Sequence, residues 1–335
     1  MTRKVLILFC GGTITMEKKS DGSLAPFAQE KVVDFLRQLE PHIFQEIDTE
    51  IRILFHQDSS NMTPKVWDDI AQTVATSYDA FDGFVVIHGT DTMAFTSAAL
   101  SFALQNLGKP VVLTGAQIPG IYMPSDAGSN FAHAMRLAIQ DVSGVFLVFG
   151  CSVFRGTRVT KISYINLEGF MSVGEPALGR IGEKMVLASH IAKRHDGILV
   201  LQKGFDHRIQ ITHLFPGLML DYLFSSWGKE SQGVILIGYG TGNLAEPHLP
   251  FLALAQEKKV PVLIRTQCIQ ETTDMAIYEL GKKALAYGAI ETFDMSLEST
   301  VTKLMWALDK KVPYSKMKEV IQKSIAGEIS QRKEQ

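Results

Sequence analysis

Cysteine is scarce in this sequence, and its few copies are poorly placed for disulfide or metal chemistry. Three cysteines occur in 335 residues, which is too few for a disulfide framework, and none forms the C-x-x-C pair of zinc or redox sites. Cys10 and Cys151 each end an apolar run, a pattern that indicates small buried side chains at strand ends. These features argue against a disulfide-rich fold and against cysteine-based zinc or redox chemistry.

A surplus of charge is also missing. Lys and Arg number 33 and Asp and Glu number 35, giving a formal net charge of −2 at pH 7. Such a balance provides no electrostatic footprint for nucleic acid or an anionic membrane. No apolar run approaches the ~20 residues of a membrane helix, and the first one is not followed by a signal-peptide cleavage site. We therefore expect a cytoplasmic protein with neither nucleic acid nor membrane as a partner.

What the sequence does contain is typical of globular domains. Hydrophobic residues make up 46% of the chain and charged residues 20%, which argues against extensive disorder. At about 100–200 residues per domain, the length predicts about two domains.

The first half of the sequence alternates apolar runs with patterns of helical period. Continuous apolar runs are typical of strands buried on both faces of a parallel sheet. Strands are expected over residues 4–10, 51–55, 83–88, 110–114 and 144–149. Helices are expected over residues 30–40, 64–78, 93–107 and 130–141.

A second set of elements begins near Gly197. Strands are expected over residues 198–202, 233–238 and 260–265. Helices are expected over 246–257, 275–287 and 297–309, the last with a tail over 315–328. We predict an α/β fold with two domains. A larger N-terminal domain (1–185) has a mostly parallel sheet flanked by helices, a linker covers 186–196, and a smaller C-terminal α/β domain covers 197–335.

Polar side chains follow several of the expected strands. Thr13 comes after a double glycine, Thr90 and Asp91 follow another strand, and Lys161 lies beyond the run that ends near residue 149. Loops at the carboxyl ends of parallel strands converge on one edge of the sheet. Two threonines, an aspartate and a lysine meeting there would supply a hydroxyl nucleophile and a proton acceptor for amide hydrolysis without a metal or cofactor.

Each of these residues also has an ordinary structural interpretation. The double glycine is compatible with a tight turn, Thr90 with a helix cap, and Lys161 with a solvated loop. A phosphate-binding loop is excluded by spacing, because neither G-x-G-x-x-G nor G-x-x-x-x-G-K-[ST] follows the first strand.

Two segments together resemble the paired signatures of the bacterial-type L-asparaginase family. They are residues 8–14 (LFCGGTI) and 86–93 (VIHGTDTM), and further matching segments follow in the family's order at 58–64, 108–115 and 238–243. The resemblance covers nearly the whole chain and is stronger to the cytoplasmic type I branch than to the exported type II branch.

The resemblance implies roles for particular residues. In similar enzymes the threonine at the position of Thr13 attacks the substrate amide and forms an acyl-enzyme. Thr90, Asp91 and Lys161 correspond to a second triad, which activates either the nucleophile or the hydrolytic water.

Further positions are assigned by the same resemblance. Ser59 and Ser60 correspond to substrate-binding positions, and Ala116 lends its backbone to the oxyanion site. Asn243 resembles a residue that reaches the active site of a neighbouring subunit, which implies a homodimer or homotetramer. No metal ligand and no cofactor are implied.

The sequence departs from the family in the lid that follows Thr13. Similar enzymes carry a catalytic tyrosine there, and Ser23 occupies the corresponding position. Either water or another tyrosine would fill that role, and Tyr122 is the candidate, with simple packing on its loop as the alternative. Cys268 resembles a position near a regulatory ligand site in some type I relatives, and its role is left open.

We expect the protein to convert L-asparagine and water to L-aspartate and ammonia. Glutamine or a broader range of amides is an alternative, because one methylene changes binding by only ~1–3 kcal/mol. Transamidation subunits acting on charged tRNA share the core motifs, but they carry an extra N-terminal domain and the sequence lacks a basic surplus. A catalytically weak sensor of asparagine or aspartate is kept open by Ser23.

Three further predictions concern side chains outside the expected site. His88 is interpreted as a packed, hydrogen-bonded residue and not as a general base. Lys303 is expected to be solvated on its helix, and His207 and His213 are expected in a polar loop.

Overall fold

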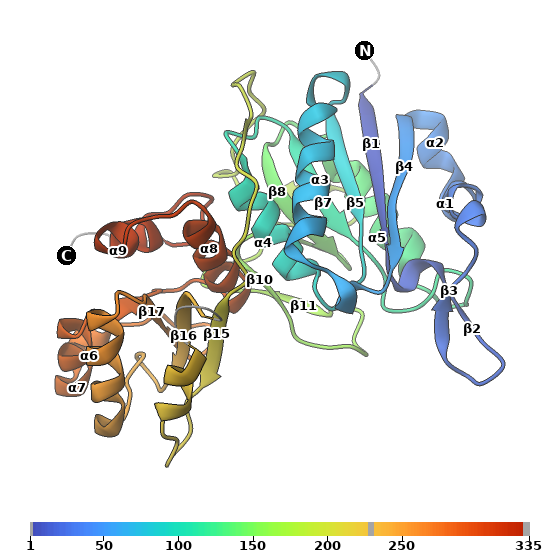
Figure 1. The fold of residues 1–335 in the computed structure, drawn as a ribbon. Helices are drawn as coiled ribbons and strands as arrows, with labels where there is room; N and C mark the ends of the chain where they lie inside the picture. The colour runs from blue at the N-terminus through green and yellow to red at the C-terminus, as the bar shows by residue number, and fades with distance from the viewer. Residues whose placement is uncertain (1–2, 227–230, 331–335) are drawn as a thin grey trace. The chain divides into compact units, whose positions relative to one another are not determined.

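A computed structural model describes residues 3–226 and 231–330 (Figure 1). The chain divides into two compact units. The first comprises the chain up to Ser172 together with Pro176–Lys203, and the second comprises Val173–Glu175 together with the chain from Gly204 onward.

The first unit is built on an eight-stranded sheet with the order β13-β12-β9-β8-β7-β5-β1-β4. The parallel part contains β1 (Lys4–Gly11), β4 (Asp48–Gln57), β5 (Gly83–Ile87), β7 (Pro110–Thr114) and β8 (Gly144–Phe149). The antiparallel extension contains β9 (Ser152–Arg155), β12 (Gly179–Ile181) and β13 (Met185–Leu187). All five strands expected in this half are present, and the prediction of a mostly parallel sheet flanked by helices is confirmed.

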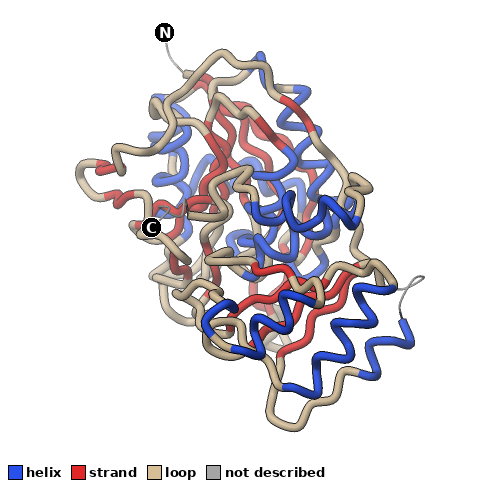
Figure 2. Tube along the Cα trace, turned by 90° about the vertical axis from the view of Figure 1, so that its left-hand side faces the viewer, coloured by secondary structure: helices blue, strands red, loops and turns tan. Residues whose placement is uncertain are grey.

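Helices cover both faces of this sheet (Figure 2). They are α1 (Val32–Leu39), α2 (Pro41–Glu46), α3 (Pro64–Thr76), α4 (Met93–Ala103) and α5 (Ala127–Ala138). Helix α4 ends before the expected residue 107 because the next residues form β6 (Leu104–Gln105), which pairs with β14 (Val200–Leu201). Asn106 then adopts a left-handed conformation with φ of 55°, which does not continue a helix.

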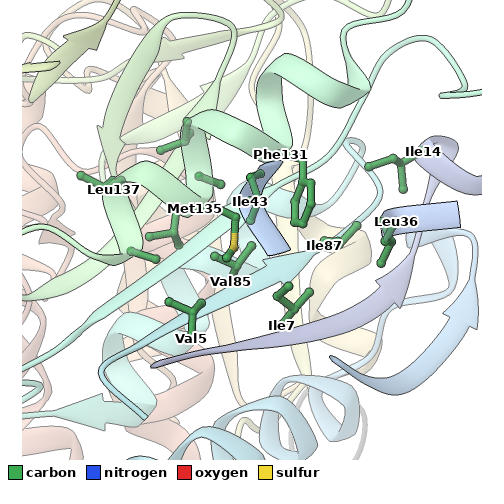
Figure 3. Packing of buried hydrophobic residues seen from close by; sticks show 14 of the residues in the cluster. Val5, Ile7, Ile14, Leu36, Ile43, Val85, Ile87, Phe131, Met135 and Leu137 are labelled. Atoms are coloured by element: carbon green, nitrogen blue, oxygen red, sulfur yellow. The ribbon is translucent and has the colours of Figure 1, made fainter. Parts of the chain in front are cut away.

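One hydrophobic core lies between the sheet and helix α5. Val5 and Ile7 of β1 and Val85 of β5 are fully buried, and they point toward Phe131 and Met135 of α5 (Figure 3). Successive side chains of a strand point to opposite faces, so their neighbours face the other layer, where α3 and α4 lie (Figure 1). Burial on both faces explains the continuous apolar runs in the sequence.

The expected linker, residues 186–196, is held by hydrogen bonds to the first unit. The guanidinium of Arg194 donates to the carbonyls of Ala138 (2.8 Å) and Gln140 (2.6 Å) and also contacts the carbonyl of Asp82. The expectation that residues 198–202 begin the second set of elements is wrong, because β14 pairs with β6 of the first unit.

The second unit contains a four-stranded parallel sheet with the order β15-β16-β17-β18. Its strands are β15 (Ile209–His213), β16 (Gly233–Gly238), β17 (Val262–Thr266) and β18 (Ile290–Glu291). Its helices are α6 (Leu249–Glu257), α7 (Glu279–Ala286), α8 (Leu297–Asp309) and α9 (Tyr314–Gln322). The expected polar loop around His213 is instead the edge strand β15, which alternates apolar and polar residues.

The expectation that Lys303 is solvated is wrong. Its side chain is completely buried, and Nζ contacts Oε1 of the equally buried Glu328 at 2.5 Å. Nζ also donates to the carbonyls of Ile321 (2.8 Å) and Lys323 (2.6 Å). The C-terminal segment after α9 therefore folds over this lysine and removes it from water.

Candidate active site

Strands β1 and β5 lie side by side, and the chain leaves them toward opposite edges of the sheet. From β1 it crosses to β4, whereas from β5 it crosses to β7 and β8. A reversal of this kind marks the position at the carboxyl ends of the strands where α/β proteins bind ligands. The segments that follow β1 and β5 carry Thr13 and Thr90.

Close glycine packing brings these two segments together. A Cβ atom on Gly12, whose φ is +103°, would lie 2.5 Å from the Cα atom of Gly89. A Cβ atom on Gly89 would lie 2.6 Å from Oγ of Ser59. Only glycine permits both approaches, so the double glycine places Thr13 beside the loop that carries Thr90.

Lys161 joins Thr90 to Asp91. Its Nζ donates to Oγ1 of Thr90 over 2.8 Å and to Oδ1 of Asp91 over 2.6 Å. The lysine ends β10 (Val159–Lys161), which pairs with β11 (Phe170–Ser172). The Lys161 side chain is 17% exposed and the Asp91 side chain 64% exposed. The structure therefore brings three of the predicted catalytic residues into one hydrogen-bonded group.

The directions of these hydrogen bonds define what the group can do chemically. Oγ1 of Thr90 accepts from Lys161 and donates to Oε1 of Gln117 over 3.4 Å. Lys161 donates to both partners, as an ammonium does. Its positive charge is suited to stabilising a developing anion, and Lys161 accepts a proton from Thr90 only after releasing one of its own.

Two residues of this group, Gln117 and Asp126, were not predicted as site residues. Nε2 of Gln117 donates to the carbonyl of Ser163 over 2.8 Å. The buried carboxylate of Asp126 accepts from the backbone N–H groups of Gln117 (3.0 Å) and Ile118 (2.9 Å). The sequence feature that could have identified Gln117 as a site residue is its position in the polar segment that follows β7.

The predicted substrate-binding residues Ser59 and Ser60 lie in a short turn after β4. Ser59 is buried, and its carbonyl accepts from Oγ1 of Thr92 over 2.8 Å. Oγ of Ser60 donates to Oδ1 of Asp58 over 2.7 Å. The Ser59 side chain thus faces Gly89, whereas the Ser60 hydroxyl is engaged within its own turn.

The other two predicted binding residues lie in different units. Ala116 is buried in the loop after β7 of the first unit. Asn243 belongs to the second unit, where its backbone pairs with Tyr239. Its buried Oδ1 has no partner among the described residues. The first unit alone therefore contains Thr13, Thr90, Asp91, Lys161, Ser59, Ser60 and Ala116.

The expected lid is a hairpin of β2 (Met16–Lys18) and β3 (Leu24–Pro26). Oγ of Ser23 donates to Oδ1 of Asp21 over 2.6 Å, which engages this hydroxyl within the turn. The hydroxyl of Tyr122 accepts from the backbone N–H of Lys18 over 3.0 Å. Tyr122 therefore contacts the hairpin directly, as an anchor for its first strand.

The prediction that His88 is packed and hydrogen-bonded is confirmed. The residue is fully buried, and burial lowers its pKa to about 4. Its ring bonds to the carbonyl of Gly89 (2.7 Å) and to Oγ1 of Thr96 (2.9 Å).

Neither a metal centre nor a membrane span is found in the part of the chain that the structure describes. Within residues 3–226 and 231–330, no group of three or more His, Cys, Asp and Glu side chains is placed to hold a metal ion. None of the described helices is long and apolar enough to cross a membrane.

Comparison with protein families gives two adjoining matches. Residues 4–193 match the family described as "Asparaginase, N-terminal". The chain belongs to the asparaginase family. Residues 208–321 match the family described as "Glutaminase/Asparaginase C-terminal domain". The resemblance inferred from the two signature segments is confirmed.

Individual members of the asparaginase family are similar over nearly the whole chain. The chain is 32% identical to an L-asparaginase of Thermococcus kodakarensis, covering 98% of this chain and 99% of that protein. It is 32% identical to a glutamyl-tRNA(Gln) amidotransferase component of Pyrococcus abyssi, covering 98% of this chain and 77% of that protein. The solved structure of L-asparaginase I from Vibrio cholerae matches with a TM-score of 0.88 at 30% identity, covering 99% of this chain and all of that one.

Proposed function

We propose that this member of the asparaginase family hydrolyses L-asparagine to L-aspartate and ammonia. The observation that carries the proposal is the contact of Lys161 Nζ with both Thr90 and Asp91, beside the glycine turn that presents Thr13. This arrangement supplies a hydroxyl nucleophile and a charged group at the carboxyl ends of β1 and β5.

The reaction follows in two steps. Oγ1 of Thr13 attacks the side-chain carbonyl carbon of asparagine, and the C–N bond then breaks. Ammonia leaves with the proton taken from Thr13, which gives an aspartyl ester. A water molecule attacks this ester, and its proton returns to Oγ1 as L-aspartate is released. Thr90 and Lys161 relay the protons, and Asp91 holds the lysine in place.

The remaining predicted residues bind the substrate. Ser59 and the backbone near Thr90 hold the α-carboxylate, Ser60 supports this turn, and the backbone of Ala116 stabilises the oxyanion. Asn243 completes the site of a neighbouring subunit in a homodimer or homotetramer. We place the enzyme in the cytoplasm, with residues 1–185 as its catalytic domain.

Ammonia release from purified protein tests the proposal. We expect turnover with L-asparagine, a loss of at least about 10³-fold in Thr13→Ala, and measurable turnover in Thr13→Ser, which keeps a hydroxyl. L-glutamine is measured in parallel, and a larger kcat/KM for it would reassign the substrate. Full activity in Thr13→Ala would show that the assignment of Thr13 as the nucleophile is wrong. Binding of L-aspartate without turnover of either amide would identify a sensor.

A further inference from the structure

The β2–β3 hairpin is rooted on the turn that carries Thr13. Strand β2 begins at Met16, directly after this three-residue turn. The chain returns at the end of β3, where the backbone N–H of Phe27 donates to the carbonyl of Thr15 over 3.0 Å. Because Met16 and Phe27 are both buried, the base of the hairpin is fixed next to Thr13.

The rest of the hairpin has little to hold it. Residues 17–24 are all exposed, and the hairpin projects from the carboxyl end of β1 (Figure 1). A hollow of about 390 Å³ lies between Glu17 of β2 and Phe35 of α1, so the hairpin is not packed closely against that helix. A two-stranded hairpin alone is only marginally stable in water. Its arrangement therefore depends on contacts from outside.

Tyr122 supplies such a contact. Its hydroxyl accepts a hydrogen bond from the backbone N–H of Lys18 over 3.0 Å. Within the part of the chain that the structure describes, no other residue from 17 to 25 hydrogen-bonds outside the hairpin. Because Lys18 is the last residue of β2, this bond holds the half of the hairpin that lies farthest from its base.

The loop that carries Tyr122 is itself held in place. At its start, the backbone N–H of Ile118 donates to the buried carboxylate of Asp126 over 2.9 Å. Further along, the N–H of Gly120 donates to the carbonyl of Ile14 over 3.1 Å. The loop is thus bonded both to the residue that follows the proposed nucleophile and, through Tyr122, to the hairpin.

We propose that Tyr122 is a positioning residue, whose hydroxyl holds the β2–β3 hairpin beside Thr13 in the arrangement that turns over L-asparagine. The inference rests on the proposed function and adds a residue that acts through the hairpin and not on the substrate. In the held arrangement Lys18 is bonded to Tyr122. In the released arrangement this bond is broken, the enzyme is inactive, and the hairpin is open to proteases.

Trypsin reports the released arrangement directly. The enzyme cleaves after lysine, and Lys18 ends β2 with Lys19 next to it. Cleavage follows the population of the opened form when opening and closing are fast. The cleavage rate of the full chain at these lysines, identified by mass spectrometry, therefore measures the released fraction. The held fraction is measured by kcat/KM for L-asparagine, because only that fraction binds productively.

Tyr122→Phe removes the hydroxyl and keeps the ring. Loss of one hydrogen bond should shift the ratio of released to held hairpin by about three- to tenfold. The shift is divided between faster cleavage and a lower kcat/KM, so the product of these two factors should be about three to ten. The urea midpoint should stay near that of the wild type, because the lost bond lies on an exposed hairpin.

Tyr78→Phe is the matched control. The hydroxyl of Tyr78 also accepts from one backbone N–H, that of Gly108, over 2.7 Å. This bond lies near the amino ends of β5 and β7, whereas Thr13 follows the carboxyl end of β1. Tyr78→Phe should therefore change neither the cleavage of the hairpin nor kcat/KM.

The outcomes separate the positioning role from its alternatives. A product near one in Tyr122→Phe, or equal effects in Tyr122→Phe and Tyr78→Phe, would overturn the inference. A product of about 100 or more would also overturn it, because one hydrogen bond to an exposed hairpin does not shift the ratio so far and the hydroxyl would then act on the substrate. A wild type that does not turn over L-asparagine overturns the proposed function, and the cleavage rates of the two variants then decide on the anchor alone.

Discussion

Two of the lysine–carboxylate contacts among the described residues have nearly equal lengths but very different surroundings. In the first unit, Nζ of Lys161 lies 2.6 Å from Asp91, whose side chain is 64% exposed. In the second unit, Nζ of Lys303 lies 2.5 Å from Glu328, and both side chains are completely buried. Distance alone therefore does not say what such a pair contributes.

The difference lies in how completely each pair is satisfied. Lys303 donates to Glu328 and to two backbone carbonyls, which uses all three ammonium hydrogens. Glu328 accepts in turn from the backbone N–H groups of Ile325 and Ala326. Lys161 is bonded to Thr90 and Asp91, and the Asp91 carboxylate faces solvent. The fully hydrogen-bonded, buried pair of Lys303 and Glu328 therefore stabilises the fold, whereas the partly exposed pair of Lys161 and Asp91 is accessible to a ligand.

Replacing Lys161 should produce the largest change. In Lys161→Met the stem of the side chain is kept and the charge is lost, so Thr90 and Asp91 lose their common donor. We expect kcat/KM for L-asparagine to fall by about 10⁴-fold, or about 5 kcal/mol in the transition state. The urea midpoint should change little, because Asp91 is exposed and is solvated when unpaired. Unfolding of Lys161→Met at much lower urea would show that this pair is structural.

Replacing Lys303 should have the opposite profile. Lys303→Met leaves Glu328 buried without its cation, and we expect the free energy of unfolding to fall by about 3–5 kcal/mol. The kcat/KM of the folded fraction should remain near that of the wild type. Lys65→Met is the matched control, because the Lys65–Asp69 contact is also 2.5 Å long but its side chains are 81% and 41% exposed. Equal urea midpoints for Lys303→Met and Lys65→Met would contradict the conclusion that the buried pair stabilises the fold more than an exposed pair does.

A double variant distinguishes two causes of the lost stability in Lys303→Met: the loss of the ion pair itself and the unpaired charge that is left buried on Glu328. In Lys303→Met, Glu328→Met no charge is left buried, so much of the lost stability should return. Burial lowers the pKa of Lys303, and Glu328 counteracts that shift, which agrees with a pair that is stable only when both members are present. A double variant no more stable than Lys303→Met would assign the loss to packing.

A smaller effect is expected on acidification, and it arises from His88, a buried group that is kept neutral. The pKa of His88 is lowered by burial from 6.5 to about 4 in the folded protein. Between these values the unfolded chain binds a proton that the folded chain does not, so stability falls as pH decreases through this window. The maximum loss is about 3 kcal/mol.

Urea titrations at about pH 7 and about pH 4.5 measure this dependence. His88→Asn serves as the control, because it has no titrating ring and should show a smaller loss of stability on acidification. An equal loss in the two proteins would place the acid-sensitive group elsewhere.

The strands of the first unit were predictable because their apolar runs report burial on both faces. The expected ranges for β7 and β8 match the bounds in the structure. Their ends were easy to place because each apolar run ends at a polar residue or is followed by a glycine. Strand β15 was missed because an edge strand alternates apolar and polar residues over only a few positions. The burial of Lys303 was missed because it depends on a segment that folds back from 25 residues further along the chain.

The same distinction applies to the candidate site. Contact among Thr90, Asp91 and Lys161 was expected from the convergence of loops at the carboxyl ends of parallel strands. The partners of Gln117 were not expected, and for His88 the sequence predicted a packed, hydrogen-bonded side chain without its particular partners. These partners depend on side-chain directions within loops and across a helix. Sequence motifs report the groups that face a substrate more readily than the groups that hold them.

The close approach of Gly12 and Gly89 restricts how this protein is able to diversify. A single added carbon at Gly12 would lie 2.5 Å from the neighbouring backbone. Even alanine, the smallest substitution, would therefore clash there, so neither natural variation nor directed evolution is expected to replace these two glycines. Libraries intended to change amide preference are better aimed at Ser23, Gln117 and Tyr122. The glycine pair would then act as a fixed spacer around which the rest of the site is redesigned.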